Sequence, residues 1–152
     1  MKGKHFEEMT VGEKFESLSR TVTETDIVNF VCLAGFTEEL FTSMEYIHNR
    51  SIFPKRIAPG ALTFSLAEGL AIQSGLLHDT GLAFLGLTNM RVNGPVFKDD
   101  TIQVEIEVID KRETSKGDRG VVTFLHRVHN QHDETVMDYT VKRMLRKKGE
   151  PA

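Results

Sequence analysis

The chain has few of the residues that mark specialised classes of protein. It has one cysteine and no tryptophan in 152 residues, so no disulfide can form within it and a disulfide-stapled secreted fold is excluded. No run of about 18 apolar residues occurs, which excludes an ordinary transmembrane helix. The first residues lack the continuous apolar stretch of a signal peptide. Together these absences predict a cytoplasmic protein.

An excess of positive charge is also missing. The net charge is -3 with both signs interspersed, so no broad cationic field is present to hold a nucleic acid. The locally basic stretch 142–148 is interpreted as a solvated strand end rather than a nucleic-acid arm. Cys32 lies among apolar neighbours and is predicted to be a buried structural thiol.

The remaining composition is that of a globular protein. Apolar residues make up 39% and charged residues 27% of the chain, and the length suits one domain with a real core. We therefore expect a single domain over residues 1–152.

The first third of the chain carries helix signals. After a candidate strand at residues 15–22, Thr23 with Asp26 three positions later predicts the start of a helix over 24–34, which Gly35 ends. A loop is expected at 36–41, and a second capping pattern opens a short helix toward Asn49.

Residues 60–77 predict a helix buried on most sides. Its apolar residues cover nearly the whole helical circumference, and they are Leu62, Phe64, Leu66, Ala67, Leu70, Ala71 and Ile72. A helix with no wide polar face is expected inside the fold.

The second half alternates with period two. Apolar and polar residues alternate over 102–108, as in a half-buried strand. Three further strands are predicted at 83–92, 119–129 and 135–146. Helices first and long strands later predict an α+β fold in which an antiparallel sheet wraps around the central helix. Open strand edges in such a sheet favour pairing with a second copy, so a homodimer is expected.

Several short segments, in this order, resemble the MaoC-like dehydratase family, which includes (R)-specific enoyl-CoA hydratases. They are Val11-Gly12, residues 20–27, residues 56–60, residues 89–92, Gly94-Pro95-Val96 and Asn130-Gln131. The resemblance covers almost the whole chain. It implies a hot-dog fold, a homodimer, and a CoA or acyl-carrier thioester bound near the subunit interface.

The family's catalytic signature is an Asp after a Gly, with a His five residues later. Here Phe36 follows Gly35 and Phe41 stands at the His position. Neither ring can accept a proton or orient a water. The sequence therefore predicts a site in which the acid/base pair is replaced and these two rings contact the substrate.

A thioester carbonyl needs hydrogen-bond donors that polarise it. Pro59, Gly60 and Ala61 begin the central helix, and the free amides and positive dipole end there are suited to this role. Alternatively, Pro and Gly only shape a helix entrance. Arg56 in the same motif is counted among the substrate-binding positions. Ser65 either contacts the thioester or bonds to its own helix backbone.

Three carboxylates are candidates for the missing acid/base groups. Glu38 and Glu39 are adjacent in the loop of the expected dyad, where one carboxylate can raise the pKa of the other; the alternative is a solvated loop. Glu68 lies in the apolar helix, where a charge is costly unless paired or functional. Its position is similar to that of the carboxylate in hot-dog thioesterases, although a salt bridge with Arg56 or Arg91 is an equal alternative.

Three functions follow from these residues. The first is a hydratase or dehydratase with a rearranged acid/base set, the second a thioesterase that uses Glu68, and the third a domain that binds an acyl thioester without catalysis. No metal is expected, because the side chains of His126, His129 and His132, on a strand and turn, do not converge. No cofactor is expected either. These histidines are expected at the surface.

Overall fold

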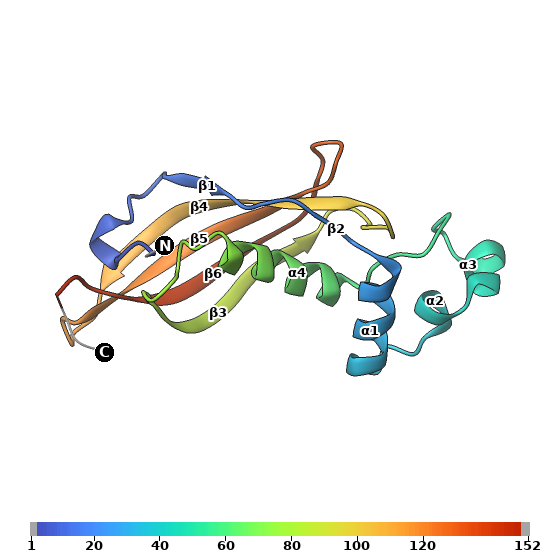
Figure 1. The fold of residues 1–152 in the computed structure, drawn as a ribbon, viewed down its shortest axis with the longest axis horizontal. Helices are drawn as coiled ribbons and strands as arrows, with labels where there is room; N and C mark the ends of the chain where they lie inside the picture. Colours follow the sequence, from blue (N-terminus) through green and yellow to red (C-terminus); the bar gives the residue numbers. More distant parts are fainter. Residues whose placement is uncertain (1–2, 150–152) are drawn as a thin grey trace.

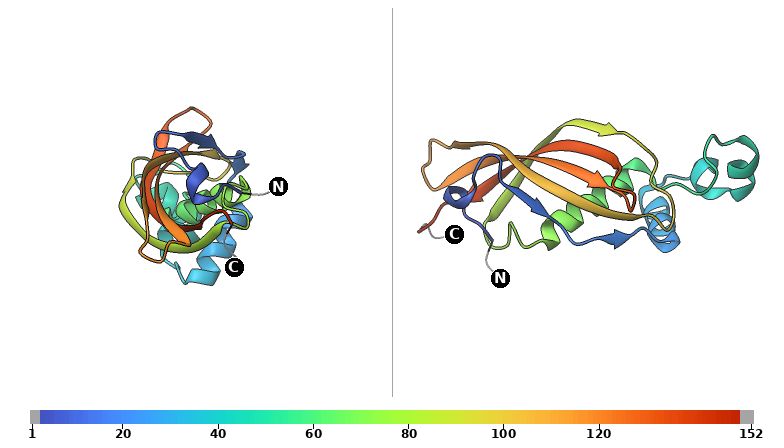
Figure 2. Two further views of the ribbon diagram at one scale, coloured as in Figure 1. Left: turned by 90° about the vertical axis from the view of Figure 1, so that its left-hand side faces the viewer. Right: turned by 90° about the horizontal axis from the view of Figure 1, so that it is seen from above.

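The computed structural model describes residues 3–149, and a curved antiparallel sheet wrapped around one helix dominates it (Figure 1). Seen end-on, the strands enclose helix α4 on most sides (Figure 2). This is the α+β hot-dog arrangement that the sequence predicts. The elements are η1 (Phe6–Glu8), β1 (Lys14–Glu16), β2 (Arg20–Thr21), α1 (Glu24–Ala34), α2 (Glu39–Thr42), α3 (Met44–Arg50), α4 (Gly60–Gln73), β3 (Gly81–Val92), β4 (Thr101–Glu113), β5 (Arg119–His129) and β6 (Thr135–Arg146).

The sheet has six strands in the order β1-β4-β5-β6-β3, with β2 also paired to β4. All pairings are antiparallel, and consecutive long strands pair along most of their length. The alternation predicted for 102–108 is confirmed, because Ile102, Val104, Ile106 and Val108 are buried. Strand β3 ends the sheet on one side.

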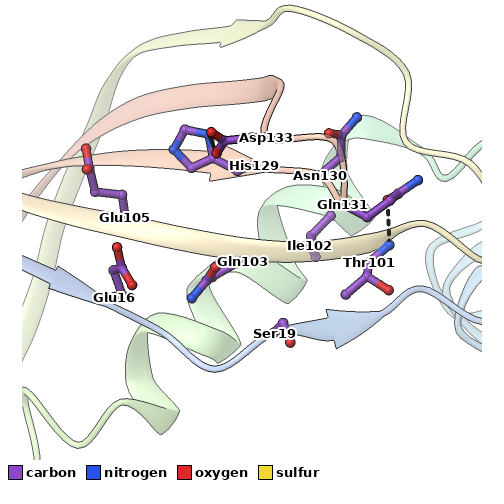
Figure 3. A pocket seen from close by; sticks show the side chains of 10 residues that line it. All are labelled: Glu16, Ser19, Thr101, Ile102, Gln103, Glu105, His129, Asn130, Gln131 and Asp133. Carbon is purple, nitrogen blue, oxygen red and sulfur yellow. Dashed lines mark hydrogen bonds and ion pairs between the residues drawn. The ribbon is translucent and has the colours of Figure 1, made fainter.

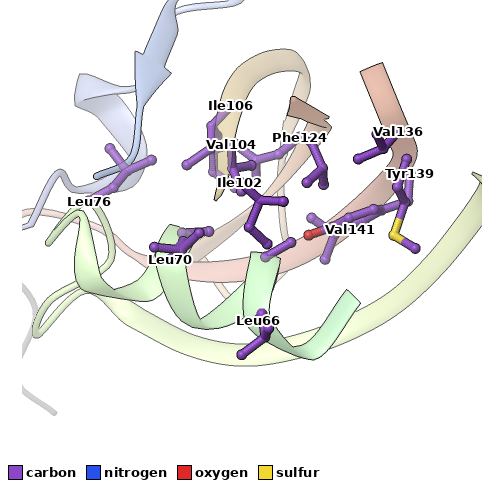
Figure 4. Close-up of a cluster of buried hydrophobic side chains, with 14 of the residues drawn as sticks. Leu66, Leu70, Leu76, Ile102, Val104, Ile106, Phe124, Val136, Tyr139 and Val141 are labelled. Carbon is purple, nitrogen blue, oxygen red and sulfur yellow. The ribbon is translucent and has the colours of Figure 1, made fainter. Parts of the chain in front are cut away.

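Helix α4 packs into the concave face of the sheet, where its side chains meet those of the strands (Figure 4). Six of its residues are buried: Leu62, Thr63, Leu66, Ala67, Leu70 and Ala71. The prediction was wrong in two respects. The helix ends at Gln73 rather than Leu77, and Ala61, Ser65 and Ile72 form an exposed stripe along it. Because the apolar residues surround the whole helix, the sequence alone cannot show which stripe lies outside.

Helices α1, α2 and α3 extend from one end of the sheet, beyond the start of α4 (Figures 1 and 2). The predicted start of α1 is confirmed, since the Thr23 hydroxyl accepts from the Asp26 amide and the Asp26 carboxylate accepts from the Thr23 amide. Gly35 ends α1 in the left-handed conformation, at φ 71°, which glycine adopts without strain.

Three further expectations for the first half were wrong. The strand expected at 15–22 is split into β1 and β2, because the Ser17 hydroxyl accepts the Val104 amide and replaces a backbone partner. The loop expected at 36–41 contains the beginning of α2. Cys32 is exposed on α1, since that helix stands away from the core.

Candidate functional site

The start of α4 has backbone amides without helical acceptors. Pro59 is the N-cap, and its carbonyl accepts from the amides of Leu62 and Thr63 at 2.9 and 3.1 Å. The amides of Gly60 and Ala61 come before those of Leu62 and Thr63, in the first turn. No carbonyl of the helix is placed to accept hydrogen bonds from them. With the positive end of the helix dipole they form a place for a partial negative charge.

A mostly apolar cavity of about 290 Å³ opens beside these amides. It lies between the first turn of α4, the segment before it, the end of β3 and the beginning of β6. Its lining includes Phe53, Ala58, Gly60, Thr63, Val92 and Met137. This volume is near the lower end of ligand pockets, which begin at about 300 Å³. The cavity can hold the small apolar part of a ligand, with a polar group of the same ligand facing Gly60.

A buried polar cluster surrounds Glu68, two turns further along α4. The Tyr139 hydroxyl donates to Glu68 Oε1 at 2.8 Å, and His126 Nδ1 lies 3.1 Å from the same oxygen. Arg143 forms an ion pair with the second oxygen, Oε2. The guanidinium of Arg143 also lies over the ring of Phe84, 5.3 Å from its centroid. The cluster therefore links α4 to β5, β6 and β3.

The surroundings of Glu68 favour its charged form. Burial alone would raise the pKa of this carboxyl, but the hydrogen bond from His126 and the positive charge of Arg143 outweigh it and hold the pKa below its usual value. Burial raises the pKa of the Tyr139 hydroxyl far above its usual range. Tyr139 is thus a hydrogen-bond donor that stays protonated.

The other two candidate carboxylates lie outside the core. Glu38 and Glu39 are exposed at the start of α2. Nearby, the Phe36 ring packs edge-on against Phe30 at 5.5 Å between centroids and lies 6.2 Å from Phe41. The expected dyad positions thus form part of an aromatic cluster beside two solvated carboxylates.

The remaining predicted residues also have identifiable partners. The Ser65 hydroxyl donates to the Ala61 carbonyl at 2.8 Å, so its backbone-bonded alternative is confirmed. Arg56 pairs with Glu24 at 3.4 Å, and the salt-bridge partner of Glu68 is Arg143 rather than Arg56 or Arg91.

The sequence matches a known family over most of its length. A family model described as MaoC like domain matches residues 6–130. The chain belongs to the MaoC-like domain family.

Individual relatives agree with this assignment. The chain is 38% identical over 117 residues to Protein MaoC of Klebsiella aerogenes, a match covering 76% of this chain and 33% of that protein. It is 29% identical over 148 residues to the beta-methylmalyl-CoA dehydratase of Chloroflexus aurantiacus, covering 96% of this chain and 41% of that enzyme. The chain therefore spans less than half the length of these two curated relatives.

A solved structure of similar length has the same fold. The X-ray structure of a monoamine oxidase regulatory protein from Archaeoglobus fulgius superposes with a TM-score of 0.88 at 37% identity. The match covers 97% of this chain and 97% of that one.

The sequence did not point to four residues that line the cavity or contact Glu68: Thr63, His126, Tyr139 and Arg143. The expectation that His126 lies at the surface was wrong, as it is 2% exposed. A signal was present, because Tyr139 and Arg143 share the inward face of β6 with Val141 and Leu145. Polar residues at inward positions of a strand need a buried hydrogen-bond or ion-pair partner. Glu68 was the charged residue of the central helix for which the sequence showed no partner.

A larger polar hollow of about 530 Å³ lies elsewhere, between the β1–β2 segment, β4 and the β5–β6 turn (Figure 3). Its side chains include Glu16, Gln103, Glu105, His129 and Asp133. It contains none of the predicted site residues. Glu105 is already paired with Arg127 at 2.6 Å, so the hollow presents solvated polar groups rather than a prepared site.

Two features are absent from residues 3–149. No group of three or more His, Cys, Asp or Glu side chains in this part of the chain is placed to hold a metal ion. No helix there is long and apolar enough to cross a membrane.

The Glu68 cluster makes a prediction for stability. We expect Glu68→Gln to lower the free energy of unfolding by about 3 kcal/mol near neutral pH, because it leaves the buried Arg143 charge unpaired. Since folding lowers the pKa of Glu68, its stabilisation is complete above the unfolded-state pKa and is lost as pH falls through the folded-state pKa. The difference between wild type and variant should therefore shrink in acid, as urea unfolding at several pH values would measure.

The matched control for this prediction is Glu39→Gln. It makes the same chemical change at an exposed position and should alter stability by less than about 0.5 kcal/mol. Equal unfolding free energies for Glu68→Gln and wild type would show that the cluster does not hold α4.

Proposed function

We propose that the chain binds an acyl thioester at the start of α4, as a domain of the hydratase/dehydratase class. The carbonyl oxygen of the thioester accepts from the Gly60 and Ala61 amides, and the acyl group enters the adjacent cavity. The observation that carries this proposal is the combination of free first-turn amides with a mostly apolar cavity beside them. The CoA thioester named for the Chloroflexus dehydratase supports CoA as the carrier.

This placement suits the addition of water to a 2-enoyl thioester. Amides that polarise the carbonyl make the third carbon of the acyl chain electrophilic and stabilise the enolate that forms. Water adds its oxygen to that carbon, and a proton is delivered to the second carbon. The reverse reaction removes the same water.

We propose that Glu38 or Glu39 moves the proton in place of an Asp-His pair. Both lie in the segment where the family signature has the Asp-His pair, and both carboxylates are exposed. Substitution of a positioned acid/base pair typically removes about 10²–10⁴-fold in rate. Hydration is therefore expected to be slow.

Glu68 is better suited to a positioning role in this proposal. It lies eight residues beyond Gly60, about 12 Å along the helix axis. Its two oxygens are occupied by Tyr139, His126 and Arg143. A thioesterase that uses Glu68 would have to break this cluster, so hydrolysis is the less favoured reaction.

A second candidate function is binding without catalysis. It is favoured by the aromatic cluster of Phe30, Phe36 and Phe41, which brings no titratable group to the expected dyad positions. Catalysis by Glu38 or Glu39 and simple binding differ in whether those carboxylates affect turnover.

One experiment separates these functions. Purified protein is mixed with crotonyl-CoA, and loss of the double-bond absorbance is followed together with release of free thiol. We expect slow hydration without thiol release, reduced at least tenfold in a Glu38→Gln/Glu39→Gln double variant and unaffected by Glu45→Gln, an exposed control on α3. Thiol release abolished by Glu68→Gln would instead support the thioesterase. Binding without any turnover would establish the non-catalytic function.

We also propose that the chain pairs with a second copy through β3. This strand ends the sheet, and its exposed apolar side chains are Leu82, Phe84, Leu85, Met90 and Val92. An unpaired strand of this length with apolar side chains is a template for pairing. The exposed Ile72 on α4 would extend the contact.

The pairing is tested by sedimentation. We expect a dimer at micromolar concentration, and a Leu85→Lys variant should shift it toward the monomer because a charge would be buried at the new interface. Leu18→Lys, at an exposed position away from β3, is the matched control and should remain dimeric. A wild-type monomer would contradict the proposal.

A further inference from the structure

Three positive side chains line one hollow beside the segment that leads into α4. The hollow has a volume of about 360 Å³, and its cations are Lys55, Arg56 and Lys98. The first two precede α4, whereas Lys98 lies in the turn before β4. The Lys98 amide donates to the Arg56 carbonyl at 3.1 Å. Backbone pairing between segments distant in sequence therefore holds the three cations together.

The protein leaves this cluster of cations weakly paired. Arg56 and Lys98 each lie 3.4 Å from an oxygen of Glu24, which is longer than a charge-assisted hydrogen bond of about 2.7–2.9 Å. The Nε atom of Arg56 is buried and has no hydrogen-bond partner within residues 3–149. Arg127 shows the contrast, because it reaches two carboxylates at 2.6 and 2.8 Å. A guanidinium has five N–H donors, so Arg56 retains donors for a further acceptor.

Of the acidic residues around the hollow, one is placed to be exchanged. The carboxylate of Asp100 accepts from the Phe97 amide and from the Gln131 side chain, at 2.7 and 2.9 Å. Asp99 is mostly exposed and lies 3.9 Å from the nearest cation. Glu24 is half exposed and contacts two of the cations. An incoming anion would therefore replace Glu24, whose carboxylate can turn to solvent.

A groove joins this hollow to the cavity beside Gly60. A hollow of about 570 Å³ lies between the two, and it shares Lys55 with the cationic hollow and Gly94 and Pro95 with the cavity. Lys55 precedes Gly60 by five residues, which is at most about 18 Å of extended chain. The pantetheine arm that joins a thioester sulfur to its phosphate has a comparable extended length. A thioester held at Gly60 can therefore bring this phosphate to Lys55.

We propose that Lys55, Arg56 and Lys98 bind the phosphate at the end of the pantetheine arm, in exchange for Glu24. This inference rests on the proposed binding of the thioester at Gly60. The phosphate oxygens accept hydrogen bonds from the two ammonium groups and the guanidinium, which are suited to an anion of this kind. The cluster thus recognises the carrier end of the ligand, whatever the acyl group is.

The test compares two thioesters that differ only in that phosphate. Calorimetric titration measures the affinity for S-butyryl pantetheine and for S-butyryl 4′-phosphopantetheine. The phosphorylated thioester should bind wild type at least about tenfold more tightly, as charged hydrogen bonds would give. A Lys55→Gln/Lys98→Gln double variant should lose most of this preference. Glu24→Gln should increase it, because the competing carboxylate is gone.

The matched control is a Lys116→Gln/Lys142→Gln double variant. It removes the same charge at two exposed lysines outside the hollow, and it should keep the wild-type preference. Thermal unfolding checks that each variant is folded. The same phosphate occurs in CoA and in the arm of an acyl-carrier protein. Butyryl-CoA and a butyryl-loaded carrier protein are therefore titrated as well, and the tighter of the two identifies the source.

The contradicting results are separate. Equal affinity of wild type for the two pantetheine thioesters, or a preference that survives Lys55→Gln/Lys98→Gln, would overturn the role of the cluster and leave the proposed function intact. A smaller preference in Glu24→Gln would overturn the exchange with Glu24. If none of these thioesters binds, the proposed function fails and this inference fails with it.

Discussion

The buried ion pair between Glu68 and Arg143 joins the central helix to strand β6 of the sheet. A carboxylate in an apolar helix is unfavourable unless charge and hydrogen bonds compensate it. Here Arg143, Tyr139 and His126 approach from two neighbouring strands. A rotation of α4 or a shift along the sheet would separate the carboxylate from these groups and leave the buried charge of Arg143 unpaired.

The same helix carries the candidate binding site at its first turn. Once Glu68 is anchored, Gly60 and Ala61 are held at the end of the sheet, between the last residues of β3 and the first of β6. The cavity there is formed by parts of the chain that are distant in sequence. The placement of the amides therefore rests both on the Glu68 contact two helical turns away and on the nearby Ala58 amide, which donates to the Val96 carbonyl at 2.8 Å.

Much of this arrangement could be predicted from the sequence. Period-two alternation located β4, and turn residues delimited β5 and β6, because exposed and buried faces alternate strictly along a strand. The capping residues Thr23 and Asp26 located α1 because they satisfy its free amides locally. Pro59 and Gly60 indicated the start of α4, because the backbone preferences of these residues are also local.

What failed depended on partners distant in the sequence. The break between β1 and β2 comes from Ser17 bonding to Val104, the exposure of Cys32 from the position of α1, and the burial of His126 from its contact with Glu68. Local patterns do not contain these pairings. Glu68 is an example. The apolar helix around it showed that burying its carboxylate would be unfavourable, but the helix sequence did not show that Arg143 is its partner.

Backbone amide signals are the most direct test of whether an acyl thioester binds at the first turn of α4. Isotope-labelled protein is titrated with butyryl-CoA, which is saturated and cannot be hydrated, while the amide resonances are followed by NMR. Binding at this turn should give the largest shifts at Gly60, Ala61 and Thr63. Shifts confined to the polar hollow around Gln103 and His129 would contradict it.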